Sequence, residues 1–274
     1  MSRKGASEVS FSDPYDASFF HFLNSQYPHL LPQQRLEIGS DRPAKNSLAE
    51  MVPHGTTVLA VRYQEGVVIA GDRMATEGYS VSARRIEKVY RTDEHSAIAI
   101  AGAAGPAIEI ARLFRIELEH YEKIEGAQLS TEGKANKLSQ MIKANLPMAI
   151  QGLVVVPIFA GFDLHRGEGR IFKYDIAGGQ YEETEYYAIG SGGRDARNTM
   201  KVLYQKNLDR EQATRLALGA LYDASEEDIA TGGPDLIRGI FPTVKRVTRS
   251  GVQDVEENVI RRELDMIIEQ RRGR

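Results

Sequence analysis

The order of strand-like and helix-like segments constrains the fold of this chain more than any other feature. Runs of β-branched and small apolar residues predict strands, and apolar residues spaced three or four apart predict helices. From residue 56 onward, these patterns occur as strands, two helices, strands, two helices and a strand. Because the helices are grouped and do not alternate one by one with strands, we expect an α+β fold with antiparallel sheets. The predicted strands cover 56–63, 67–72, 96–101, 153–162, 171–174, 186–189 and 241–248, and the predicted helices cover about 110–121, 131–145, 194–205 and 216–224.

The first 55 residues differ from the rest of the chain. They contain five of the ten prolines and no sustained period of 2 or 3.6 residues, and proline interrupts helices because it lacks the N–H donor. We therefore predict an irregular arm over residues 1–55, whose Phe19, Phe20 and Phe22 favour docking on another surface over a disordered tail. At the other end, residues 256–274 are predicted to form a tail with a short surface helix.

Composition excludes several classes of function. The net charge is -3, from 35 basic and 38 acidic residues, which disfavours a nucleic-acid-binding protein. The chain has no cysteine, so disulfide bonds, thiol catalysis and cysteine-ligated metals are excluded. No apolar stretch approaches the roughly 20 residues that span a membrane, and the N-terminus lacks the apolar segment of a secretory signal. We expect a cytoplasmic protein with neither nucleic-acid nor membrane partners.

Familiar hydrolase and phosphate-binding motifs are also missing from the sequence. None of the six histidines falls in a zinc-hydrolase pattern, and there is neither a P-loop nor a Gly-x-Ser-x-Gly elbow. The run Gly190-Ser191-Gly192-Gly193 lies between a predicted strand and a predicted helix, and we interpret it as a tight turn that caps the helix. We expect no metal and no cofactor.

The junction between Gly55 and Thr56 carries the strongest functional signal. If the chain is cut after Gly55, Thr56 gains a free α-amine beside its own hydroxyl. Such an amine has a reference pKa of roughly 7.7–8.0, so near neutral pH it can accept the hydroxyl proton and make the oxygen a nucleophile. Glycine at position 55 also permits the strained backbone that an attack on its own carbonyl requires. Because Gly-Thr-Thr alone is a weak signal, the assignment depends on its context.

Two charged residues supply part of that context. Asp72 ends the second predicted strand, and Lys88 lies on the next extended segment, so both can approach Thr56 at neighbouring strand ends. A buried lysine would lower the pKa of the amine and of the hydroxyl, and Asp72 would offset the cost of burying it. The alternative is a surface ion pair, which contributes little to stability.

Two glycine-containing loops complete the candidate site. The run from Ala101 to Gly105 follows a predicted strand, and its backbone N–H groups can form an oxyanion hole; the alternative is a plain strand-to-helix turn. The run Asp228-Ile-Ala-Thr231-Gly-Gly follows a predicted helix, where the alternative is a polar C-terminal cap.

Taken together and in this order, these motifs resemble the β-subunit of the proteasome core particle, most closely the actinobacterial type. The matching residues are Thr56-Thr57, Gly71-Asp72-Arg73, Lys88, Ala101-Gly102, Gly190-Ser191-Gly192 and Asp228-x-x-Thr231-Gly232-Gly233. Two stretches, 118–123 and 231–242, are characteristic of the actinobacterial branch. The resemblance covers about residues 56–255 and implies that residues 1–55 are a propeptide.

The resemblance implies a catalytic role for seven of the matching residues. Thr56 matches the N-terminal nucleophile, Asp72 and Lys88 match the charged pair that tunes it, and Gly102 matches the oxyanion-hole backbone. The group that hydrogen-bonds the threonine amine corresponds to Ser191, Asp228 and Thr231, the last of which is often serine in the family.

The resemblance also implies residues that bind the substrate. Thr76 matches a residue that binds the substrate backbone. The pocket for the residue before the cut bond would be lined by Ala75, Ile86, Ile100, Ala104 and Ile108. Because all five are apolar, a hydrophobic side chain at that position is favoured; the alternative is that these are simply core positions of a sheet.

The fold implied by the resemblance is a four-layer αββα sandwich of the N-terminal nucleophile hydrolase type. The implied activity is that of a threonine endopeptidase, made as an inactive precursor that cleaves itself between Gly55 and Thr56. The implied partners are proteasome α-subunits, further β-subunits in heptameric rings of an α7β7β7α7 barrel, an ATPase ring that feeds unfolded polypeptides, and substrates tagged by a small protein modifier. The alternatives are a non-catalytic ring subunit, a peptidase of the dodecameric ATP-dependent type, and a small-molecule amidase.

Overall fold

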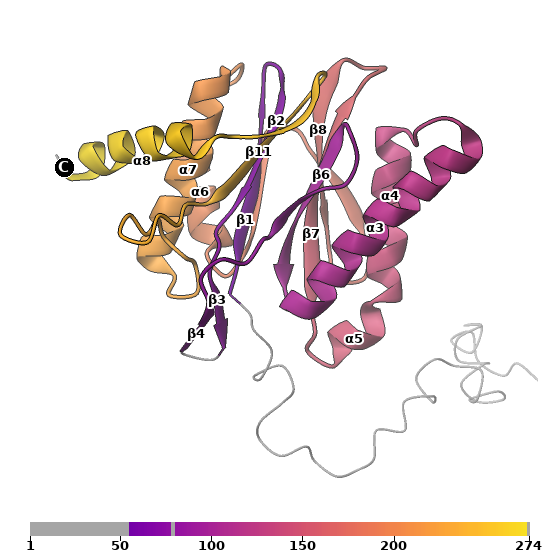
Figure 1. Ribbon diagram of the computed structural model, residues 1–274, viewed down its shortest axis with the longest axis horizontal. Coiled ribbons are helices and arrows are strands. Elements are labelled where there is room, and N and C mark those ends of the chain that lie inside the picture. The colour runs from indigo at the N-terminus through magenta and orange to yellow at the C-terminus, as the bar shows by residue number, and fades with distance from the viewer. Residues whose placement is uncertain (1–54, 78–79, 273–274) are drawn as a thin grey trace, which may run out of the picture. The chain divides into compact units, whose positions relative to one another are not determined.

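The computed structural model of the chain describes residues 55–77 and 80–272 (Figure 1). The expected arm and its aromatic residues at 19–22 lie outside the described residues. Within the described ranges, the secondary structure consists of two five-stranded antiparallel sheets, one two-stranded hairpin and six helices. The α+β class expected from the sequence is thereby confirmed.

Both large sheets are built from strands that are neighbours in space but not always in sequence. The first sheet has the order β10 (Tyr186–Gly190), β1 (Thr57–Tyr63), β2 (Gly66–Gly71), β11 (Thr243–Thr248), β12 (Gly251–Asp254). The second has the order β5 (Val89–Arg91), β6 (Ser96–Gly102), β7 (Val155–Asp163), β8 (Glu168–Tyr174), β9 (Gln180–Glu183). The hairpin pairs β3 (Ala75–Glu77) with β4 (Ser80–Ala83).

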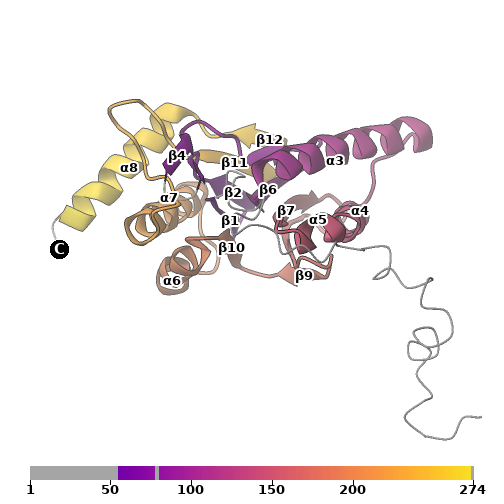
Figure 2. The ribbon, with the colours of Figure 1, turned by 90° about the horizontal axis from the view of Figure 1, so that it is seen from below.

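The two sheets pack face to face and helices cover their outer faces, as Figures 1 and 2 show. The first sheet is covered by α6 (Gly193–Leu203), α7 (Arg210–Glu227) and α8 (Glu257–Arg272). The second is covered by α3 (Ala104–Glu125) and α4 (Thr131–Ala144), which a short α5 (Leu146–Ile150) follows. Three hydrophobic clusters therefore fill the spaces between four successive layers.

Strand β1 illustrates why the sequences of the central strands are almost continuously apolar. Successive side chains of a strand point to opposite faces. Val58 and Ala60 lie in the cluster between the sheets, whereas Leu59 and Val61 lie in the cluster beneath the helices. Because both faces of the strand are covered, both sets of positions are apolar.

Local sequence signals place the helix starts. The Ser130 side chain caps α4, because it accepts a hydrogen bond from the Gly133 N–H. Asp209 and Gln212 form a capping box at the start of α7, which begins at Arg210, ahead of the predicted 216–224 segment.

The C-terminal segment differs from the expected surface tail. Helix α8 has 16 residues, and Ile260, Leu264 and Ile267 belong to the hydrophobic cluster that α7 also lines. The carboxylate of Glu263 is buried and accepts a hydrogen bond from Arg215 at 2.7 Å. The boundary expected at residue 255 therefore does not separate a tail from the core. The spacing of three and four residues between these apolar side chains places them on one face of the helix, which packs inward.

The ends of several strands converge at one edge of the two-sheet sandwich. Thr57 pairs with Gly190 across β1 and β10, and Val58 pairs with Gly71 across β1 and β2. The residues that precede β1 and follow β2 are therefore neighbours. The segment before β5 joins them, since a Cβ added at Gly71 would lie 3.6 Å from the Cβ of Lys88. No helix in the described ranges combines the length and the hydropathy needed to cross a membrane.

Candidate active site

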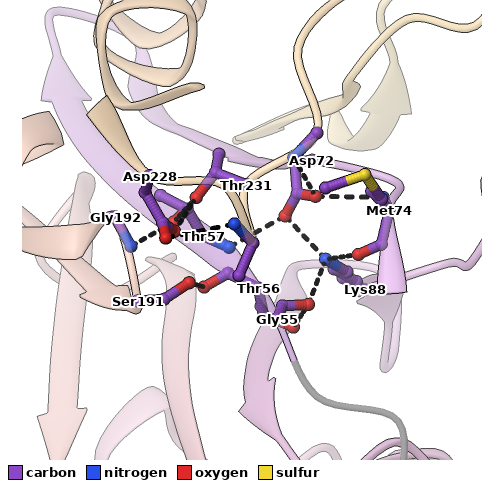
Figure 3. Close-up of polar contacts among 12 residues, drawn as sticks. Gly55, Thr56, Thr57, Asp72, Met74, Lys88, Ser191, Gly192, Asp228 and Thr231 are labelled. Atoms are coloured by element: carbon purple, nitrogen blue, oxygen red, sulfur yellow. Dashed lines mark hydrogen bonds and ion pairs between the residues drawn. The ribbon is translucent and has the colours of Figure 1, made fainter. Parts of the chain in front are cut away.

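A buried ion pair lies where these strand ends meet (Figure 3). The Lys88 ammonium is 2.6 Å from the Asp72 carboxylate, and the two side chains are 4% and 0% exposed. Asp72 Oδ1 also accepts the Thr57 N–H at 2.8 Å. Asp72 Oδ2 accepts the N–H groups of Met74 at 3.0 Å and Gly232 at 2.9 Å. Four donors thus satisfy one carboxylate, which is the condition under which a charge can be buried.

The Lys88 ammonium directs its three donors at three different oxygens. Besides Asp72, it donates to the carbonyl of Met74 at 2.5 Å and to the carbonyl of Gly55 at 2.9 Å. Burial lowers the pKa of Lys88 below its usual value, and the negative charges of Asp72 and Asp228 oppose that shift. The structure thus places Asp72 and Lys88 together beside the Gly55–Thr56 junction, whereas their role in tuning Thr56 stays a prediction.

Two donors converge on the carbonyl of Gly55. The Thr56 hydroxyl donates to this oxygen at 2.6 Å, alongside Lys88 at 2.9 Å. Gly55 has a φ of +90°, and a Cβ added there would lie 2.5 Å from the Thr76 hydroxyl oxygen and 2.8 Å from the Ala230 carbonyl oxygen. Only glycine fits this backbone without displacing its neighbours. The same geometry places Thr76 beside the bond.

A second set of polar residues lies on the other side of Thr56. Thr231 donates to Asp228 at 2.5 Å, and its hydroxyl oxygen lies 2.7 Å from that of Thr57. Ser191 donates to the Thr56 carbonyl through its backbone N–H at 2.9 Å and its hydroxyl at 3.3 Å. The structure thus brings Ser191, Asp228 and Thr231 together, with direct contacts to Thr56 O and Thr57. Their expected role toward a free amine stays a prediction, since the Thr56 nitrogen is an amide in this unbroken chain.

An apolar pocket opens next to the bond. All five residues expected to line it do so, together with Gly55, Thr56, Lys88 and Gly102; the five are Ala75, Ile86, Ile100, Ala104 and Ile108. Gly102 has a φ of +118°, and a Cβ there would come within 2.0 Å of the Val154 carbonyl oxygen, so the position requires glycine. The roles of Gly102 as oxyanion hole and of the pocket in substrate binding stay predictions.

Sequence reasoning did not assign several residues that take part in this arrangement. Thr57, Met74, Gly192 and Gly232 all make hydrogen bonds within it. Tyr90 also lines the pocket; burial and the nearby Glu87 raise its pKa to about 12. The signal for Thr57 was present in the Gly-Thr-Thr run, but nothing in a sequence says that backbone groups such as those of Met74 turn toward a lysine.

A Lys–Asp pair directed at the carbonyl of a Gly–Thr bond, beside an apolar pocket, is an arrangement suited to peptide-bond chemistry. The sequence matches the family model described as proteasome subunit over residues 52–237, which is more than half of the chain. The chain therefore belongs to the proteasome subunit family.

Curated relatives narrow this assignment further. A proteasome subunit beta of Acidimicrobium ferrooxidans is 57% identical over 231 residues, covering 83% of this chain and 85% of that protein. Proteins with the same name from Acidothermus cellulolyticus and Streptomyces griseus are each 50% identical, covering 94% and 95% of this chain and 88% and 92% of the relatives. The resemblance to actinobacterial β-subunits is thereby confirmed.

Proposed function

We propose that this chain is a catalytic β-subunit of a proteasome core particle and acts as a threonine endopeptidase of the N-terminal nucleophile hydrolase type. The observation that carries the proposal is the convergence of the Thr56 hydroxyl and the Lys88 ammonium on the Gly55 carbonyl oxygen. The first group is a nucleophile adjacent to the carbonyl carbon, and the second stabilises negative charge that develops on the oxygen. The name shared by the relatives supports the same conclusion.

The first reaction is cleavage of the chain by its own threonine. Thr56 Oγ attacks the Gly55 carbonyl carbon, the C–N bond breaks, and the proton of the hydroxyl is transferred to the departing Thr56 nitrogen. Water then hydrolyses the resulting ester between Gly55 and Thr56 Oγ. The products are residues 1–55 with a new carboxylate and a chain that begins with the free amine of Thr56.

The second reaction uses that amine on other polypeptides. The α-amine accepts the Thr56 hydroxyl proton, and the oxygen attacks a substrate carbonyl. Lys88, supported by Asp72, stabilises the developing negative charge, and the Gly102 N–H serves as the oxyanion hole. Ser191, Asp228 and Thr231 hold the amine. Thr76 binds the substrate backbone, and the adjacent apolar pocket takes a hydrophobic side chain before the cut bond.

This order of events explains why a precursor would be harmless. While the Gly55–Thr56 bond is intact, no amine is available to activate the hydroxyl for other substrates. In the proposed particle, α-subunits and further β-subunits form heptameric rings in the cytoplasm and enclose the site, and an ATPase ring supplies unfolded, tagged polypeptides. Cleavage on assembly would then confine activity to the enclosed chamber.

Mass spectrometry of the assembled chain and a peptide-hydrolysis assay test the proposal. We expect an N-terminus at Thr56, and complete loss of both cleavage and hydrolysis in Thr56→Ala. Thr199→Ala is a matched control, because the Thr199 hydroxyl bonds Asp223 between α6 and α7, away from the site. Hydrolysis retained by Thr56→Ala would require another nucleophile, and an inactive wild-type particle would favour a non-catalytic ring subunit.

A further inference from the structure

Thr57 has no task in the mechanism above, yet it touches both halves of the site. Its side chain is fully buried, and its backbone N–H donates to Asp72 at 2.8 Å. Its hydroxyl lies 2.7 Å from the Thr231 hydroxyl and accepts the Gly192 N–H at 2.9 Å. Figure 3 shows Thr57 between the Asp72–Lys88 pair and the Asp228–Thr231 pair. A residue that makes these bonds connects the two groups mechanically.

The donors and acceptors allow only one direction of hydrogen bonding through these hydroxyls. Thr231 has a single hydroxyl proton and donates it to the Asp228 carboxylate at 2.5 Å. Thr231 must therefore accept the hydrogen bond that it shares with Thr57, which makes Thr57 the donor. Thr57 in turn accepts a hydrogen bond from the Gly192 N–H, because a backbone N–H can only donate. A one-way series runs from the Gly192 N–H through Thr57 and Thr231 to Asp228.

This direction matters for a free amine on Thr56. A neutral amine acts as a base only while its lone pair is available to the hydroxyl proton of Thr56. A neighbouring hydroxyl that donated to the amine would occupy that lone pair. Because the proton of Thr231 is directed at Asp228 and Thr57 donates to Thr231, Thr231 offers the amine only an acceptor. One N–H of the amine can then be donated to the remaining lone pair of the Thr231 oxygen, and the lone pair of the amine stays free.

We propose that Thr57 is a positioning residue whose hydroxyl fixes the orientation of the Thr231–Asp228 acceptor pair toward the Thr56 amine. This inference rests on the proposed function, because that amine exists only after the chain is cut. Thr57 itself touches neither substrate nor the reacting atoms. It acts through Thr231, and through its position directly after Thr56 at the start of β1.

Two substitutions separate the hydroxyl from the shape of the side chain. Thr57→Val keeps the β-branched shape and removes the hydroxyl, so the Gly192 N–H loses its partner and the Thr231 hydroxyl loses the donor that orients it. We expect kcat for peptide hydrolysis to fall about ten- to a hundredfold, with KM within about twofold. Thr57→Ser keeps the hydroxyl and removes a buried methyl, and we expect its kcat to lie within about threefold of wild type.

A purely structural role predicts the opposite ranking. If packing alone matters, Thr57→Val should be nearly neutral and Thr57→Ser the more damaging change, because valine preserves the volume of the side chain. Thr214→Val is the matched control for loss of a buried threonine hydroxyl. Thr214 is fully buried in α7 and donates to the Arg210 carbonyl at 2.7 Å. Because Arg210 is not part of the candidate site, removal of the Thr214 hydroxyl should leave kcat unchanged.

The measurement uses the full chain in its assembled particle. Each rate is divided by the fraction of chains that begin at Thr56, counted by mass spectrometry, so that slow cleavage of the precursor is not mistaken for slow hydrolysis. A wild-type particle without hydrolysis would refute the proposed function. If the wild type is active, two results would refute the role of Thr57 and leave the proposed function standing. These are a kcat for Thr57→Val equal to that of wild type, and a loss of more than tenfold in the kcat of Thr57→Ser. If Thr57→Val fails to fold, Thr57→Ser still tests the proposal, because a purely structural role predicts a large loss of kcat in that variant.

Discussion

Replacing Asp72 by asparagine removes the charge of the buried ion pair and leaves its shape almost unchanged. Asp72 Oδ1 faces Thr57 N and Lys88 Nζ, and Oδ2 faces the N–H groups of Met74 and Gly232. In either orientation, the asparagine amide places an NH₂ donor against two other donors. Lys88 also stays buried without a counter-ion.

The expected cost follows from this geometry. Breaking a buried pair by removing one partner destabilises a protein by about 3–5 kcal/mol. We therefore expect Asp72→Asn to lower the free energy of unfolding by that amount, measured by urea denaturation. All chains compared carry Thr56→Ala as a common background. This substitution removes the proposed nucleophile, so the bond between residues 55 and 56 should stay intact in each chain. The slope with urea concentration should not change, since the surface exposed on unfolding is the same.

A double-mutant cycle isolates the interaction from the two side chains. Lys88→Met removes the ammonium and retains an unbranched apolar chain of similar length. Because each single variant leaves one member of the pair unpartnered, the double variant should be less destabilised than the sum of the two by about 2–3 kcal/mol. Additive effects, or a cost below about 1 kcal/mol for Asp72→Asn, would show that the buried pair does not exist as described.

Four further outcomes are expected from other parts of the structure. Burial lowers the pKa of Lys88 from its usual value of about 10.5. Between the folded and the unfolded pKa the unfolded chain binds more protons, so stability should rise with pH. Urea denaturation at pH 8–10 should therefore show a steeper rise in stability for wild type than for Lys88→Met. Gly55→Ala should slow self-cleavage at least about tenfold, because its Cβ would lie 2.5 Å from the Thr76 hydroxyl oxygen; an unchanged fraction of cut chains by mass spectrometry would contradict this. Ala104→Val should narrow the pocket and shift the residue before the cut bond toward smaller side chains, as read from the masses of the peptides produced. Leu264→Ala should cost about 2–5 kcal/mol because this side chain of α8 is fully buried, whereas a cost below about 0.5 kcal/mol in denaturation would mean that α8 is a surface helix.

Much of the fold follows from patterns that span only a few residues. The β1–β2 hairpin and the start of α4 were predictable because each depends on neighbouring residues: β-branched runs around a turn, and a serine side chain that caps the next turn of backbone. The short strands β3, β4, β9 and β12 were missed. Each has three or four residues, of which at least two are exposed or half-buried, so no apolar pattern marks it.

The candidate site shows a different limit of sequence reasoning. The types of residue needed near Thr56 could be deduced, because a nucleophile with a buried lysine requires a counter-ion. The donors that complete the site could not, since Gly232 is separated from Asp72 by 160 positions and contributes a backbone N–H that any residue possesses. Only the pairing of the strands brings such groups together.

The geometry of Lys88 also explains how one site can perform both proposed reactions. In the intact chain the three N–H groups of its ammonium are directed at Asp72, Met74 and Gly55. In the proposed self-cleavage, two of these acceptors would remain, whereas the Gly55 carbonyl would depart with residues 1–55. The third N–H then points at the position of the carbonyl that was attacked, which is where the carbonyl of the next substrate must lie to meet Thr56 Oγ. Self-cleavage would thus leave a buried donor without an acceptor, and because such a donor is costly, the site favours a substrate carbonyl or the Thr56 hydroxyl in the place that Gly55 vacated.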